Sequence, residues 1–377
     1  MKGELSTFWG KLLKGEQGQI IAWHPLIDHC ADVAACCEAL LEKTIIRRRL
    51  ATLAGLDSLS AKMVERLCVL ASLHDLGKYG QGFFAKALPS PANVAGHVQE
   101  ALAVLTAACT GEFPEGTQLR EVLRLDHLAT WSAEPETVLR LLWASICHHG
   151  RPYSCTQVPA PKRWHWRTNE GRAPFDGIAQ LQRFAENWYP EAWKDGGEPL
   201  PDAPAFAHAF SGMVMLADWL GSDHERWFSF SDVEPRDDDP LRRMRWARER
   251  AREALAAMHV DPDQARGAIG KQTLTFERVF GFEKPREMQK RVEQLPIAHG
   301  GSIAILEAET GSGKTEAAVL HYLRLFNAGE VDGLYFALPT RTAATQMHER
   351  VNKAVRAVFE EEIARPPVVL AVPGYLR

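Results

Sequence analysis

Two adjacent side chains that can bind metal, His74 and Asp75, end an apolar run in the segment Leu-His-Asp-Leu-Gly-Lys, residues 73–78. The apolar spacing before them predicts a buried helix over residues 61–77. A buried carboxylate without a partner is costly, whereas a metal ion satisfies an acid and an imidazole together. The pair therefore indicates a metal site. The simpler alternative is a structural role, in which Asp75 forms an ion pair with Lys78, three residues later, at the end of the helix.

Five further residues of ligand type lie on or beside other predicted helices: His29, His97, His148, His149 and Asp218. His148 and His149 end a helix predicted over residues 136–147, where they could converge on one centre or serve as exposed cations at a helix C-terminus. Asp218 lies among apolar residues of a helix predicted over residues 206–220. A ligand role explains this acid well, although a cap or a partnered buried acid remains open.

Together the seven residues supply imidazole nitrogens and carboxylate oxygens and no thiolate. The set is too large for one tetrahedral zinc, and it suits two ions of the manganese, iron, cobalt or nickel type. Two such ions about 3.5–4 Å apart can stabilise the attacking and leaving oxygens of a phosphodiester. The sequence therefore predicts phosphodiester hydrolysis as the leading chemistry.

A second motif, Ala-Glu-Thr-Gly-Ser-Gly-Lys-Thr at residues 308–315, lies between a predicted strand and a predicted helix. Glycine-permitted backbone N–H groups and a helix N-terminus can hold a polyphosphate at such a junction. Lys314 would contact the β- and γ-phosphates, and Thr315 would hold magnesium. The nucleotide-binding residues expected in this loop are Thr310, Gly311, Ser312, Gly313, Lys314 and Thr315.

A competent NTPase also needs an acidic residue on a later strand and, usually, an arginine from a second domain. Neither feature follows the loop before Arg377. We therefore expect no ATPase or helicase activity from this chain by itself.

The chain has 377 residues, of which 46% are hydrophobic, and a net charge of −4. This length predicts two domains, and this charge argues against a wholly basic nucleic-acid binder. Basic residues still gather at residues 161–167, among tryptophans, and on an arginine-rich helix that follows residue 240; both are candidate contacts for a single strand or plain solvated surfaces. The number of cysteines is odd and no C-x-x-C occurs, which favours a reducing cytoplasm. The sequence shows no leader and no apolar stretch of about 18 residues, so we expect a soluble protein with no membrane contact.

The residue pattern is helical up to residue 258 and alternating from residue 271. We therefore expect an all-α domain at residues 1–258, a linker at residues 259–270, and an incomplete α/β parallel sheet at residues 271–377. The strands of that sheet are predicted at residues 302–307, 333–338 and 368–372.

In their order, these motifs resemble those of the CRISPR-associated helicase-nucleases of type I interference, in which an HD nuclease domain is fused to a superfamily 2 helicase. The first half carries five of them: His29-x-x-Asp32-Val33-Ala34, His74-Asp75-Leu76-Gly77-Lys78, His97, His148-His149 and Ala217-Asp218-Trp219-Leu220. In the second half Gln289 resembles the adenine-reading glutamine, residues 308–315 resemble helicase motif I and residues 338–341 motif Ia. The later helicase motifs and the second RecA-like domain are absent, which suggests a truncated chain.

The resemblance implies one metal held by His29, His74, Asp75 and Asp218, and a second held by His97, His148 and His149 with Asp75 bridging. It also implies that Lys78 steadies a phosphate or orients Asp75, so that His74, Asp75 and Lys78 form the catalytic set. The implied substrate is single-stranded DNA exposed in the R-loop of a Cascade surveillance complex. ATP and magnesium would serve the full-length helicase.

Two other functions remain open at this point. An HD phosphohydrolase of nucleotides would use the same metals, but it would not need the phosphate loop or the segment around Gln289. A catalytically idle fragment that binds Cascade or DNA would have no reason to retain all seven ligands. Metal content and cleavage of circular single-stranded DNA distinguish these possibilities.

Overall fold

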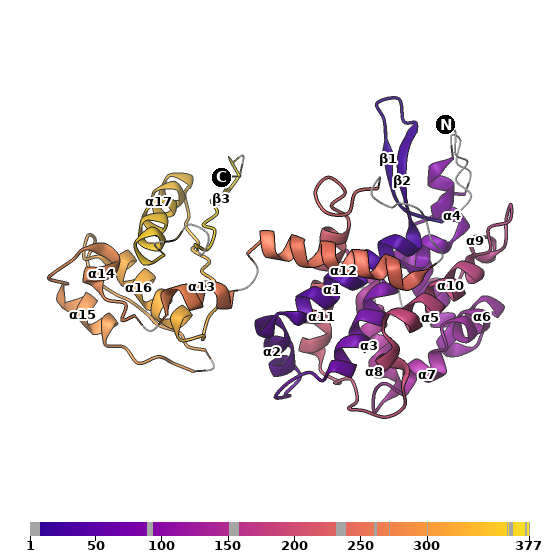
Figure 1. Cartoon of the computed structure of the whole chain (residues 1–377), viewed down its shortest axis with the longest axis horizontal. Coiled ribbons are helices and arrows are strands. Elements are labelled where there is room, and N and C mark those ends of the chain that lie inside the picture. The colour runs from indigo at the N-terminus through magenta and orange to yellow at the C-terminus, as the bar shows by residue number, and fades with distance from the viewer. Residues whose placement is uncertain are drawn as a thin grey trace. The chain divides into compact units, whose positions relative to one another are not determined.

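The computed structural model describes residues 8–88, 93–150, 158–230, 239–259, 262–270, 272–299, 301–359, 361, 365–373 and 375–376. The chain divides into two compact units, Met1–Ala257 and Met258–Arg377. Figure 1 shows the first unit as a group of packed helices with one projecting hairpin. No helix in the described part of the chain is both long and apolar enough to cross a bilayer.

The first unit is mostly helical. Its α-helices are α1 (Leu26–Glu42), α2 (Thr44–Leu53), α3 (Ala61–Ser72), α4 (Gln81–Phe84), α5 (Val98–Thr110), α6 (Pro114–Val122), α7 (Leu125–Ala129), α8 (Pro135–Ile146), α9 (Arg163–Trp166), α10 (Pro174–Trp188), α11 (Pro204–Gly221) and α12 (Pro240–Ala257). Among the described residues, short 3₁₀ helices lie at Leu76–Tyr79, Ala85–Ala87 and Pro190–Trp193. Helix α1 packs against α3, α11 and α12, and most of its residues are buried. A helix surrounded in this way is the centre of the unit.

The expectation of an all-α domain was wrong in one respect. Strands β1 (Trp9–Lys14) and β2 (Ile20–Pro25) form an antiparallel hairpin in which Lys11 lies opposite His24. Gly18 adopts a positive φ of 78° in the connecting turn, and the Gly18 N–H donates to the carbonyl of Gly15. This tight turn pairs two short segments that are too brief to show a strand pattern in the sequence.

The helix predicted over residues 61–77 ends earlier, at Ser72. The His74 N–H then donates to the Ala71 carbonyl, a three-residue spacing that tightens the chain into the 3₁₀ helix Leu76–Tyr79. A side chain at Gly77 would clash with the backbone of His97. The chain therefore leaves the helix so that His74 and Asp75 lie in a turn packed closely against the start of α5.

The second unit contains α13 (Pro262–Ile269), α14 (Phe276–Phe280), α15 (Glu287–Glu293), α16 (Lys314–Asn327) and α17 (Arg341–Val358). Its core includes apolar residues of α13, α14, α16 and α17. The linker expected at residues 259–270 is therefore wrong for most of its length, because Ala265 and Ile269 of α13 belong to this core.

The expected parallel sheet is also not found among the described residues. Residues 302–307 and 333–338 form no strand, and the strands described here are β3 (Ala371–Val372) and β4 (Tyr375–Leu376), which pair antiparallel. Ile303 and Ile305 are 95% and 85% exposed. Their apolar pattern suits a buried strand, but a strand also needs neighbours that bond to its backbone and cover its faces.

The buried side chain of His165 in α9 provides a test of this fold. Its Nδ1 accepts a hydrogen bond from the Gly82 N–H at 3.2 Å, and burial lowers the pKa of His165 to about 4. An unfolded histidine titrates near pH 6.5, so the unfolded chain takes up this proton first and stability is lost as the pH falls from about 6.5 towards 4. For the metal-free protein, we expect the His165→Gln variant to lose roughly 2 kcal/mol less unfolding free energy between about pH 7 and pH 5 than the unsubstituted chain.

Urea denaturation followed by tryptophan fluorescence at the two pH values measures this difference. The matched control is His208→Gln, because His208 is exposed on α11. Equal losses for the unsubstituted chain and His165→Gln would show that His165 is not held neutral by the fold.

Candidate metal centre

The structure brings all seven predicted ligands together from separate parts of the first unit. They come from α1, the turn after α3, the residue before α5, the end of α8 and the last turns of α11: His29, His74, Asp75, His97, His148, His149 and Asp218. Their ligand atoms form two groups, and within each group the atoms lie within 4.8 Å of one another.

The first group consists of four buried residues, His29, His74, Asp75 and Asp218. The Nε2 atom of His29 lies 3.2 Å from Asp75 Oδ2 and 3.1 Å from Asp218 Oδ1. The Nε2 atom of His74 lies 3.2 Å from the same Asp75 oxygen. Two imidazoles and two carboxylates therefore face a common point in the interior.

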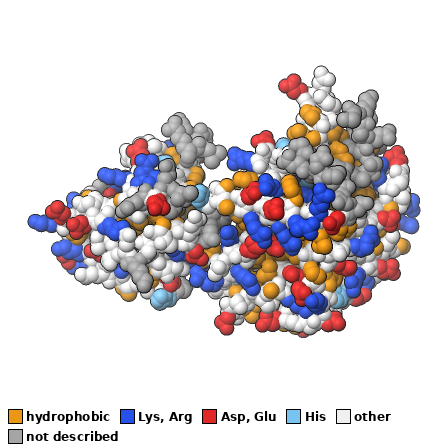
Figure 2. All heavy atoms as spheres, in the orientation of Figure 1, with side chains coloured by type: hydrophobic (Ala, Val, Ile, Leu, Met, Phe, Trp, Pro, Cys, Tyr) orange, Lys and Arg blue, Asp and Glu red, His pale blue; other side chains and the backbone are white. Residues whose placement is uncertain are grey.

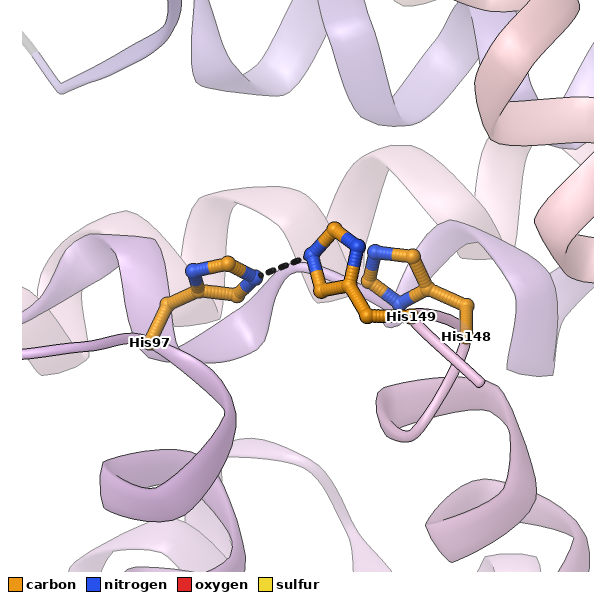
Figure 3. A group of neighbouring side chains, drawn as sticks. All are labelled: His97, His148 and His149. Carbon is orange, nitrogen blue, oxygen red and sulfur yellow. Dashed lines mark hydrogen bonds between the residues drawn. The ribbon is translucent and has the colours of Figure 1, made fainter. Parts of the chain in front are cut away.

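The second group consists of His97, His148 and His149, and Figure 3 shows their rings gathered side by side. The Nε2 atoms of His97 and His149 are 2.9 Å apart. Asp75 Oδ1 lies 3.5 Å from His97 Nε2 and 4.0 Å from His148 Nε2. The two oxygens of Asp75 thus face different groups, and His149 is exposed, so the second group opens to solvent.

Two of the histidines are oriented by the helix ends that precede them. The Nδ1 atoms of His74 and His148 lie 3.0 Å from the carbonyl oxygens of Ala71 and Ser145, three residues earlier in each case. A ring nitrogen beside a carbonyl must carry the proton, which leaves the Nε2 lone pair free to bind a cation. Both Nε2 atoms are buried without a hydrogen bond of good geometry.

Burial favours the neutral form of four histidines of the cluster. It lowers the pKa values of His97 and His148 to about 3, and it lowers the pKa values of His29 and His149. Burial by itself would raise the pKa of Asp75, but the positive charge of Lys78 together with the interactions with His74 and His29 holds that pKa well below its usual range.

The pKa of Asp218 is also lowered, because hydrogen bonding and electrostatic interaction with His29, together with smaller effects of His74 and Lys11, outweigh the effect of burial. Neutral imidazoles and ionised carboxylates are the states in which these groups bind metal. The unpartnered Nε2 atoms and the absence of thiolates among the ligand atoms fit divalent transition ions.

Lys78 shows that the metal-site and ion-pair interpretations of residues 73–78 are compatible. Its Nζ lies 2.5 Å from Asp75 Oδ2 and donates to the Gly10 carbonyl at 3.1 Å, so the plain ion pair with Asp75 is present. That ion pair uses Asp75 Oδ2, the same oxygen that faces His29 and His74, so the ion pair and the histidine cluster occur together. Lys78 is buried, and its contacts hold the Asp75 carboxylate in place.

One residue beside the cluster was not foreseen. Lys11 of β1 places its Nζ 3.4 Å from Asp218 Oδ1. The two residues are 207 positions apart. The sequence offered only a Gly-Lys pair after Trp9 as a signal, and it could not show which side chain this lysine meets.

The predicted nucleotide loop lies within the second unit. Gly311 and Gly313 have φ values of 81° and 87°, and α16 begins at Lys314, whose Nζ donates to the Glu309 carbonyl at 2.9 Å. Gln289 of α15 donates through Nε2 to the Gly313 carbonyl at 3.4 Å. The glutamine and the loop therefore meet, and Thr310, Ser312 and Thr315 occupy the rest of the loop and its junction with α16.

Several expected nucleic-acid contacts have internal partners. Lys162 pairs with Glu100 and Arg163 with Glu115, which ties α9 to α5 and α6. Helix α12 pairs with α1 through Arg243–Asp32, Arg248–Glu38 and Arg252–Glu42. Figure 2 shows lysine and arginine side chains along the visible face of this unit. Residues 151–157, part of the Pro- and Trp-rich region, lie outside the described residues.

Comparison with known proteins places this geometry in a family. The Cas3 HD domain family matches residues 9–228, and the DEAD/DEAH box helicase family matches residues 286–365. The CRISPR-associated endonuclease/helicase Cas3 of Escherichia coli (strain K12) is 27% identical over 388 residues, an alignment that covers 97% of this chain and 41% of that protein.

Solved structures share the fold. The crystal structure of T. fusca Cas3 with ATP superposes with a TM-score of 0.64 at 22% identity, covering 94% of this chain and 38% of that one. A chain of a CRISPR RNA-guided surveillance complex before nicking superposes with a TM-score of 0.51 at 21% identity, covering 91% of this chain and 37% of that one. The chain spans about two fifths of the length of these relatives.

The HD domain family accounts for more than half of the residues, and it spans the whole set of converging ligands. The helicase match covers the loop before α16 and the glutamine beside it. The chain therefore belongs to the Cas3 family, as an HD domain followed by part of a DEAD/DEAH box helicase domain.

Proposed function

We propose that the chain is a metal-dependent endonuclease that hydrolyses phosphodiesters of single-stranded DNA in type I CRISPR interference. The observation that carries the proposal is the position of Asp75, whose two oxygens face two separate groups of histidines. Two divalent ions bridged by one carboxylate are suited to displacement at phosphorus. The curated relative from Escherichia coli, named an endonuclease/helicase, supports the same reaction.

The chain's own residues divide into two sets in this proposal. His29, His74, Asp75 and Asp218 would hold one ion, and His97, His148 and His149 would hold the other with Asp75 bridging. When bound, manganese, iron, cobalt or nickel would supply an activated nucleophile and neutralise phosphate charge. Lys78 orients Asp75 from the buried side. Substrate would enter from the side of His149, the exposed member of the second group.

The proposed partners of the chain are suggested by the proteins that it resembles. A surveillance complex whose chain shares this fold supports docking to Cascade, which would present an R-loop strand to the centre. Gln289 and the loop from Thr310 to Thr315 would bind ATP and magnesium in a complete helicase, because the loop leads directly into the N-terminus of α16. These activities belong in the cytoplasm, where CRISPR defence meets invading DNA.

The Asp75→Asn variant tests the centre, because it removes the negative charge at almost constant volume. We expect the number of tightly bound ions per chain to fall below two, and cleavage of circular single-stranded DNA without ATP to fall roughly 100-fold or more. Metal analysis after dialysis and gel analysis of the circle, with manganese, cobalt, nickel or iron(II), measure both effects.

Circular dichroism of each protein establishes that the variant is folded, and Asp126→Asn is the matched control because Asp126 is exposed on α7. A circle is opened only by an endonuclease, so linearisation reports the proposed reaction directly. The proposal fails if Asp75→Asn cleaves as fast as the unsubstituted chain, or if the circle survives every metal.

The second metal position is tested separately through His149, whose exposure makes substitution safe for the fold. We expect His149→Ala to retain one tightly bound ion in the buried first group and to lose the second. Cleavage should fall at least about tenfold, since one bound ion cannot stabilise both oxygens of the displacement. Calorimetric titration with metal gives the number of bound ions, and two bound ions with unchanged cleavage would contradict the role of His149 as a ligand of the second ion.

A further inference from the structure

Strand β1 is held directly against the metal centre. A Cβ atom at Gly10 would lie only 2.7 Å from the Cβ of His29, so the strand passes over α1 at a distance that a glycine permits. From the other side, Lys78 donates to the Gly10 carbonyl at 3.1 Å. The ladder with β2 shifts its register between Trp9 and Lys11, which is the point of contact. The backbone on either side of Gly10 is therefore fixed by the centre itself.

This anchoring places Lys11 at the rim of the centre. Its Nζ lies 3.4 Å from Asp218 Oδ1, and its side chain is 29% exposed, whereas His29, His74 and Asp75 are fully buried.

Lys11 differs from Lys78 in what its ammonium group can still reach. Lys78 is buried and held by Asp75 and Gly10. The hydrogen bond recorded for Lys11 among the described residues is a single long one to Asp218. A lysine ammonium has three donors, and an Asp218 oxygen that coordinates a cation becomes a weaker acceptor. Lys11 therefore keeps donors available on the solvent side.

We propose that Lys11 binds a non-bridging oxygen of the substrate phosphate at this centre. Lys11 is partly exposed and lies beside Asp218, so a phosphate that approaches the ligands from solvent can meet its ammonium group. At that position a compact positive charge can hold the phosphate by a charge-assisted hydrogen bond. The inference rests on the proposed function for its substrate, and it adds a phosphate contact that comes from β1 instead of the helical HD core.

The plainer interpretation is that Lys11 only balances the charge of Asp218. The two interpretations differ in what a substitution changes. A charge-balancing lysine affects metal occupancy or folding stability, whereas a phosphate-binding lysine affects phosphate affinity at full metal occupancy.

The test compares Lys11→Met, which keeps the length of the side chain, with Lys11→Arg, which keeps the charge. Lys14→Met is the control, because Lys14 belongs to the same strand but is exposed and bonds to the Lys86 carbonyl. With manganese-loaded protein, calorimetry measures the affinity for inorganic phosphate, metal analysis measures occupancy, and initial rates on single-stranded DNA give kcat and KM.

We expect Lys11→Met to keep its metal and to lose phosphate affinity and kcat/KM by about 10- to 100-fold. Lys11→Arg should retain most of both, and Lys14→Met should match the unsubstituted chain. Unchanged phosphate affinity in metal-loaded Lys11→Met overturns the proposal, as does a loss fully explained by lower metal occupancy. A lack of detectable phosphate binding by the unsubstituted chain overturns it too.

The phosphate measurement also separates this inference from the nuclease proposal. If the unsubstituted chain cleaves no DNA but binds phosphate in a manner that depends on Lys11, the nuclease proposal fails and the Lys11 contact stands. If DNA is cleaved and phosphate binding is independent of Lys11, the reverse holds.

Discussion

The structure of the first unit depends on the buried negative charge of Asp75. Removing a carboxylate from water is costly unless charge and hydrogen bonding compensate for it. Lys78 compensates through the Oδ2 atom, and a second donor of its ammonium group bonds to the Gly10 carbonyl, which holds β1 against the centre. The same Oδ2 atom also faces His29 and His74, and Oδ1 faces His97 and His148, whose unpartnered Nε2 atom, like that of His74, can bind a cation. The same charge therefore organises the fold and the chemistry.

A rigid frame keeps these groups in place. Asp32 of α1 is fully buried, and it binds His24 Nε2 at 2.7 Å and Arg243 of α12 at 2.5 Å. This network ties β2 and α12 to the helix that carries His29, one turn from Asp32. Close packing also positions His74 and His97, because Gly77 allows the turn after α3 to reach the backbone of His97. A centre assembled from five segments requires contacts of this kind to hold each ligand in position.

Sequence reasoning selected seven candidate ligands, which the structure brings together, and it placed most helices of the first unit, because residue type and helical periodicity are local properties. It placed the end of α3 five residues too late, since apolar residues continue past Ser72 and only the approach to His97 forces the turn. It missed the β1–β2 hairpin, whose strands are short. It also predicted a parallel sheet, whereas residues 302–307 and 333–338 form no strand and residues 371–372 pair antiparallel with β4.

The sequence by itself determined which side chains could bind metal or phosphate and in what order they follow one another, because these properties belong to single residues and short motifs. Only the tertiary structure decided that the two oxygens of Asp75 face different histidine groups, and that Lys11 meets Asp218 across 207 residues. The physical reason is that distances between segments are set by packing and by compensation of buried charge. Neither packing between distant segments nor charge compensation can be predicted from the spacing of residues within a short motif.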